Sequence, residues 1–139
     1  MFPEAPSVFR PDERQSRIRI LLVDDHVMFR QCLRNIVDGH AHLVVVGEAS
    51  NGLEAIDAVH HMRPDVVVMD INMPKMNGIE ATQRIKEVFP DTSVIGLSVH
   101  QSTDKVEKMW TAGICAYLMK ESVDETLCRA IEDAVIERR

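Results

Sequence analysis

Residues 66–70 read VVVMD, four consecutive apolar residues followed by an aspartate. A short run of β-branched residues that is apolar at every position, and not only at every second one, is typical of a strand buried on both faces. Such strands belong to parallel sheets that carry helices on both sides. The stretch therefore predicts a central strand of an α/β protein, with an aspartate at its carboxyl end.

Four more apolar runs occur around this stretch, and segments with helical spacing separate them. The five expected strands are Ile18 to Val23, Leu43 to Val46, Val66 to Met69, Val94 to Leu97 and Cys115 to Met119. The first intervening segment, near Val27 to Asp38, carries its apolar residues on one helical face. The alternation predicts a (βα)₅ doubly wound parallel five-stranded sheet, flavodoxin-like, with strand order 2-1-3-4-5.

Composition limits the domain count and the function classes. The chain has 139 residues, 45% of them apolar, which suits one domain over residues 18 to 137. Residues 1 to 17 contain three prolines and show no periodicity, so we expect a flexible arm there. A net charge of −6 without a basic cluster argues against nucleic-acid binding by this segment.

Location follows from two further features of the sequence. No apolar stretch approaches the ~20 residues that span a bilayer, so no membrane contact is expected. The three cysteines are far apart and lie among apolar residues. Because that spacing is typical of reduced cysteines, we expect a soluble cytoplasmic protein.

Polar residues follow four of the five expected strands, namely Asp24 and Asp25, Asp70, Ser98 and Lys120. Ligands of such sheets bind beyond the carboxyl ends of the strands, where the strand order reverses. Three carboxylates gathered there repel one another unless a cation joins them, and oxygen ligands in this number suit Mg²⁺. A carboxylate can also attack phosphorus and form an acyl phosphate. Mg²⁺, the Lys120 ammonium and the Ser98 hydroxyl would then stabilise the transferred group.

Four motifs, ILLVDDH, VVVMDINMPKMNGIEA, VIGLSVH and AGICAYLMKE, occur in this order. With them, residues 18 to about 137 resemble the receiver domains of response regulators in bacterial two-component systems. The resemblance implies that Asp70 accepts a phosphoryl group from a sensor histidine kinase. It also implies roles for other residues: Asp25 as a direct Mg²⁺ ligand, Asp24 as a ligand mostly through water, Asn72 as a ligand through its backbone carbonyl, Lys120 as a phosphoryl contact, and Ser98 with Tyr117 as the switch pair. Asn72 and His100 would be modulators at the mouth of the pocket.

The sequence says less about what the domain controls once it is phosphorylated. Glu121 follows Lys120 where many receivers have proline, and with DINMPKMNG and AYLMKE this resembles the NarL/FixJ-like branch. Members of that branch usually carry a C-terminal helix-turn-helix, so the resemblance implies control of transcription through a DNA-binding domain absent from this chain. A stand-alone receiver that acts by protein–protein contact is the alternative. In either case a second copy is a candidate partner after phosphorylation.

Other interpretations of these residues remain. Asp24 or Asp25 could merely cap the next helix, and Tyr117 could be a packing aromatic. An aspartyl-phosphate hydrolase would use an acid two residues after its nucleophile, but Asn72 stands there and cannot shuttle a proton. A flavin or nucleotide module would need a glycine-rich loop after the first strand, where this chain has DDHVMFRQ.

Overall fold

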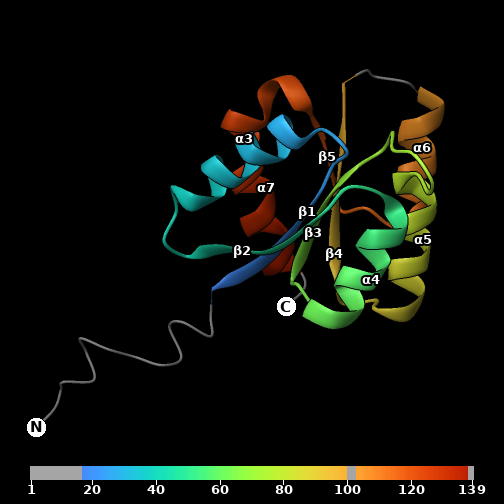
Figure 1. The fold of residues 1–139 in the computed structure, drawn as a ribbon, viewed down its shortest axis with the longest axis horizontal. Helices are drawn as coiled ribbons and strands as arrows, with labels where there is room; N and C mark the ends of the chain where they lie inside the picture. The colour runs from blue at the N-terminus through green and yellow to red at the C-terminus, as the bar shows by residue number, and fades with distance from the viewer. Residues whose placement is uncertain (1–16, 100–102, 138–139) are drawn as a thin grey trace, which may run out of the picture.

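The computed structural model describes residues 17–99 and 103–137, which form a five-stranded parallel sheet between two layers of helices (Figure 1). The strands are β1 (Ile18–Val23), β2 (Leu43–Ala49), β3 (Val66–Asp70), β4 (Ser93–Ser98) and β5 (Ala116–Met119). The helices are α3 (Val27–Asp38), α4 (Gly52–Met62), α5 (Gly78–Val88), α6 (Thr103–Ala112) and α7 (Val123–Glu137), with a 3₁₀ turn η1 (Lys120–Ser122) before α7. The strand order β2-β1-β3-β4-β5 confirms the predicted fold.

Alternate residues of the central strands enter two separate cores. In β1, Ile20 and Leu22 pack with residues of α3 and α7, whereas Leu21 and Val23 pack toward α4, α5 and α6. Figure 1 shows the same division, with α3 and α7 on one side of the sheet and the other three helices opposite. The strands are apolar at every position because both faces are covered. No helix in the described ranges is long and apolar enough to cross a membrane.

The end of β2 corrects one predicted boundary. The apolar run ends at Val46, but the strand continues to Ala49, with Glu48 opposite Leu22 and Ala49 opposite Val23. The pairing register shifts between Ile20 and Leu21, so that Val46 is passed over and Gly47 pairs with Leu21. A charged residue is tolerated because β2 is an edge strand and the Glu48 side chain is partly open to water. The predicted arm, residues 1 to 17, lies outside the described residues except for Arg17.

The loop after β3 is held by a close backbone approach at Gly78. Its N–H donates to the carbonyl of Ile71 at 2.9 Å, and a Cβ on Gly78 would collide with the carbonyl oxygen of Asp70. Asn77 caps the following helix, since its side chain accepts from the N–H of Glu80 at 3.0 Å. The loop therefore returns tightly to α5, which fixes the chain immediately after Asp70.

Candidate functional site

Three aspartates from two neighbouring strand ends form one acidic pocket. Asp24 and Asp25 follow β1 directly, Asp70 ends β3, and the two strands pair as far as Val23 opposite Met69. Ligand atoms of Asp24, Asp25, His26 and Asp70 all lie within 4.8 Å of one another. Asp24 is 0% exposed and Asp70 is 3% exposed. The structure thus brings together the three carboxylates that the sequence placed at adjacent strand ends.

Lys120 supplies the positive charge of this pocket. Its Nζ lies 2.6 Å from Asp24 Oδ2 and 3.4 Å from Asp70 Oδ2. The same Nζ lies 4.7 Å from the centroid of the Phe29 ring, a cation–π contact contributed by α3. Because the Lys120 side chain is only 10% exposed, its ammonium is held between two carboxylates and an aromatic face.

The pocket fits a hard divalent cation. Asp24 Oδ2 and Asp25 Oδ1 are buried and receive no hydrogen bond, although Lys120 Nζ lies 2.6 Å from the first and the His26 ring Nδ1 lies 3.3 Å from the second. Buried oxygens without hydrogen bonds are costly, and three carboxylates outnumber the single ammonium. The three carboxylates offer oxygen ligands, which are the ligands that Mg²⁺ prefers. The residues present therefore suit Mg²⁺.

The electrostatics of the pocket raise the pKa of Asp70 to about 6. Burial has the largest effect, because it disfavours the charged carboxylate, and the neighbouring charge of Asp24 adds to it. The Lys120 ammonium and the backbone N–H of Asn72 act in the opposite direction. Without a metal, Asp70 is therefore partly protonated near neutral pH.

This pKa predicts how the stability of the metal-free protein depends on pH. Asp70 has a folded pKa of about 6 against 3.8 for an ordinary aspartate, so between these values the folded state binds a proton that the unfolded state lacks. The free energy of unfolding should rise as the pH falls from about 8 to about 5, by about 1 kcal/mol after allowance for solvent screening. Thermal denaturation in a chelator, with Asp70→Asn as the control, measures it. An identical pH slope in the two proteins would contradict the assignment.

The remaining residues proposed from the sequence lie at or near the same edge. Asn72, in the loop after β3, accepts a hydrogen bond on Oδ1 from Lys105 Nζ at 2.7 Å. Ser98 is buried at the end of β4, one residue beyond the partner of Asp70. Tyr117 pairs with Gly96 and packs with the apolar residues beneath α4, α5 and α6. His100 lies outside the described residues.

Several contacts of the pocket were not predicted from the sequence. The N–H of His26 donates to Asp24 Oδ1 at 2.8 Å, and its ring Nδ1 lies 3.1 Å from the same atom. Phe29 is one of the apolar residues of α3, and its ring also contacts Lys120. Lys105 on α6 was not singled out, and its contact with Asn72 joins residues 33 positions apart. Of these, only His26 carried a local signal, namely its position directly after the acidic pair.

Comparison with known proteins gives a consistent result. Residues 20–132 match the model of the response regulator receiver domain. Similar curated proteins include the transcriptional regulatory protein DegU of Brevibacillus brevis, 36% identical over 85% of this chain and 50% of DegU. Another is the nitrate/nitrite response regulator protein NarL of Escherichia coli strain K12, 33% identical over 86% of this chain and 56% of NarL. The chain thus spans about half the length of these curated relatives.

Solved structures agree with this similarity. A LuxR-family two-component response regulator from Aurantimonas sp. SI85-9A1 superposes with a TM-score of 0.83 at 35% identity, covering 89% of each chain. The response regulator domain of Thermotoga maritima CheB superposes with a TM-score of 0.81 at 32% identity, covering 86% of this chain and 97% of that one.

Proposed function

Because the chain belongs to the response regulator receiver family and resembles its LuxR/NarL-type members, we propose that Asp70 accepts a phosphoryl group from a sensor histidine kinase, with Mg²⁺ as cofactor. The observation that carries this proposal is the position of Asp70. Its carboxylate lies among two further aspartates and faces an ammonium at 3.4 Å. Receiver domains are regulators, so the chemistry at Asp70 serves as a signal and not as turnover of a metabolite.

The chain's own residues would divide the reaction among them. An Asp70 oxygen attacks phosphorus, a P–O bond forms, and the P–N bond to the kinase histidine breaks, leaving its electron pair on the imidazole. Lys120 neutralises charge on the phosphoryl oxygens, and the Ser98 hydroxyl donates to one of them. When bound, Mg²⁺ supplies the remaining positive charge. We assign its direct protein ligands to Asp25, Asp70 and the backbone carbonyl of Asn72, with Asp24 bound mostly through water.

The Mg²⁺ assignment is tested by Asp25→Asn. The Oδ1 atom of Asp25 is buried and receives no hydrogen bond, although the His26 ring Nδ1 lies 3.3 Å away, so a bound cation would satisfy it. Loss of that charge should weaken Mg²⁺ binding about tenfold by calorimetry. Asp57→Asn, an exposed carboxylate on α4, is the matched control and should leave binding unchanged. Equal Mg²⁺ affinities of wild type and Asp25→Asn would rule out Asp25 as a ligand.

We further propose that phosphorylation reaches the outer surface through Ser98 and Tyr117. A phosphoryl group adds about −1.5 to −2 charges, and the Ser98 hydroxyl can move toward it. Movement at the end of β4 would open space beside α6, which the Tyr117 ring, already packed above Gly96, could enter. The altered surface would comprise α6, β5 and α7. Because a ligand shifts an equilibrium only by its differential affinity, both states must already be close in energy.

Ser98→Ala is expected to leave Asp70 phosphorylatable while uncoupling it from that surface. Amide chemical shifts with and without beryllofluoride, a stand-in for the phosphoryl group, report the coupling. In wild type, α6 and β5 should shift, and in Ser98→Ala they should shift much less. Tyr117→Ala should behave likewise. Equal shifts in wild type and Ser98→Ala would show that Ser98 only ends a strand.

The output follows from the relatives. DegU and NarL are named as regulators of transcription or of the response to nitrate and nitrite. We propose that this receiver controls transcription in the cytoplasm through a DNA-binding domain, with phosphorylation favouring contact between two copies. A receiver that acts only by protein–protein contact is the alternative. Attachment of a helix-turn-helix domain in the full gene product would decide between them.

A further inference from the structure

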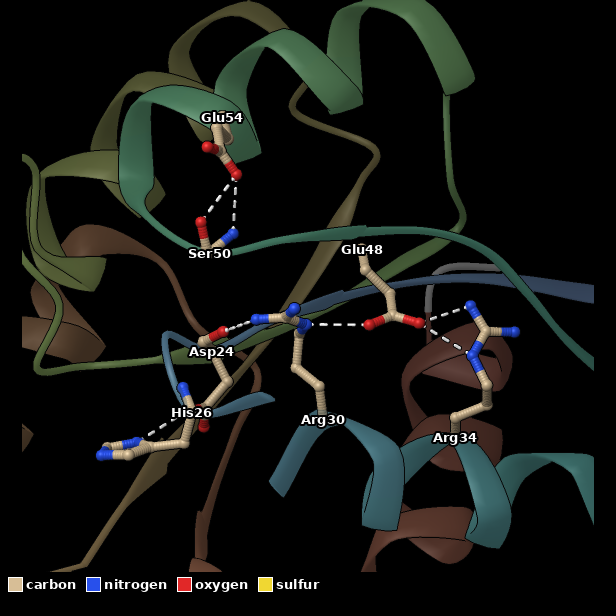
Figure 2. Close-up of polar contacts among 7 residues, drawn as sticks. All are labelled: Asp24, His26, Arg30, Arg34, Glu48, Ser50 and Glu54. Atoms are coloured by element: carbon tan, nitrogen blue, oxygen red, sulfur yellow. Dashed lines mark hydrogen bonds and ion pairs between the residues drawn. The ribbon is translucent and has the colours of Figure 1, made fainter. Parts of the chain in front are cut away.

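A charged chain of contacts links the acidic pocket to the edge of the sheet. Arg30, in the first turns of α3, donates through Nη1 to the main-chain carbonyl of Asp24 at 2.5 Å. Its Nε donates to Glu48 Oε1 on β2 at 2.8 Å. Figure 2 shows the guanidinium lying between the two acidic residues, with Glu48 also held from the far side by Arg34. The Arg30 side chain is only 14% exposed.

The carbonyl that Arg30 contacts has a particular place in the chain. β1 ends at Val23, so the carbonyl of Asp24 lies beyond the strand, and the guanidinium supplies its hydrogen bond. The same carbonyl belongs to the peptide bond that joins Asp24 to Asp25. Because a peptide unit is planar, fixing the direction of this carbonyl also fixes the direction in which the chain enters Asp25.

The strand β2 anchors Asp24 through both of its main-chain groups, one directly and one through Arg30. The N–H of Asp24 donates to the carbonyl of Ala49 at 3.1 Å, and the residue before Ala49 is Glu48, which holds Arg30. The pKa of Glu48 lies below its ordinary value, chiefly because of its hydrogen bond with Arg30. A planar guanidinium with two of its donors engaged has one orientation, which a flexible lysine ammonium would not have.

From these contacts we infer that Arg30 is a positioning residue that sets the geometry of the Asp24–Asp25 pair for Mg²⁺. This inference rests on the proposed function of the pocket. Arg30 is not placed to act on Mg²⁺ by its charge. Its guanidinium is paired with the Glu48 carboxylate, and its contact with Asp24 is to the main-chain carbonyl and not to the side chain. Its effect on Mg²⁺ is therefore geometric, through the peptide between the two aspartates. The alternative is that Arg30 and Arg34 together only fasten α3 to β2.

Paired arginine variants separate the two possibilities. Arg34 binds the same Glu48 carboxylate from the next turn of α3, at 2.6 Å, and lies on the far side of Glu48 from Asp24 (Figure 2). Arg30→Met should weaken Mg²⁺ binding about tenfold, as loss of an outer-shell contact commonly does. Arg34→Met should change Mg²⁺ affinity less than about twofold, although it should lower the melting temperature by about as much as Arg30→Met does. Glu48→Gln, which keeps Arg30 but removes its charged anchor, should fall between them.

A measurement without metal keeps the test independent of Mg²⁺. The His26 amide is hydrogen-bonded to Asp24 Oδ1, so its hydrogen exchange in a chelator reports the order of the acidic loop. It should accelerate in Arg30→Met and in Glu48→Gln and stay unchanged in Arg34→Met. If Arg30→Met fails to fold, the Glu48→Gln and Arg34→Met pair decides by the same two readouts.

The outcomes are distinct. If Arg30→Met and Arg34→Met have equal Mg²⁺ affinities and equal exchange rates of the His26 amide, the positioning role of Arg30 is wrong. Both arginines would then only fasten α3 to β2. Absence of Mg²⁺ binding in the wild-type protein would instead contradict the proposed function. The two failures therefore cannot be confused.

Discussion

Replacement of Lys120 by methionine should slow phosphorylation of Asp70 by small phosphodonors by about 100-fold, the usual cost of removing one charge-stabilising donor. The ammonium lies 2.6 Å from Asp24 and 3.4 Å from Asp70, and its removal leaves the phosphoryl oxygens facing carboxylates without that cation. Lys120 is not a metal ligand, and its ammonium only competes with Mg²⁺ for the carboxylate of Asp24. Mg²⁺ affinity should therefore change much less than the rate of phosphorylation. Rates of labelling by phosphoramidate and calorimetric Mg²⁺ titrations measure the two effects separately.

A matched lysine variant controls for loss of charge alone. Lys108 is exposed on α6 and takes no part in the acidic pocket described above, so Lys108→Met should leave both measurements unchanged. Because the Lys120 ammonium lowers the pKa of Asp70, its removal should raise that pKa further, so the labelling rates of the two proteins should be compared over a range of pH. A variant that loses Mg²⁺ but labels normally once the metal is saturating would show that Lys120 serves the metal and not the phosphoryl group.

Most of the fold could be predicted from the sequence because local pattern and tertiary environment agree. The strand VVVMD is apolar throughout, and both of its faces are covered. The end of β2 could not be found in this way, because Gly47 and Glu48 continue the ladder without apolar side chains. An edge strand is specified partly by its single neighbour, and the register shift beside Leu21 has no signature in the sequence of β2 itself.

The charged groups of the site could be predicted from the sequence, but the residues that contact and orient them could not. Asp24, Asp70 and Lys120 each end an apolar strand, so parallel topology alone brings them to one edge. Phe29 and Arg30 both lie on α3. The apolar spacing of the helix predicts a buried position for Phe29, and an arginine beside it would ordinarily be expected to face solvent. Their contacts with the pocket depend on how α3 is rotated against the sheet, and sequence periodicity gives the buried face without giving individual partners.

The central claim, that Asp70 is the phosphoacceptor, is tested most directly by locating the phosphoryl group. Asp70 is the one carboxylate of the pocket that comes from β3, and its carboxylate oxygen lies 3.4 Å from the Lys120 ammonium. With phosphoramidate and Mg²⁺, the intact wild-type protein should gain one phosphoryl group that hydroxylamine removes, and Asp70→Asn should gain none. Asp25→Asn should still be labelled at saturating Mg²⁺, though more slowly. Equal, hydroxylamine-labile labelling of wild type and Asp70→Asn would contradict the account.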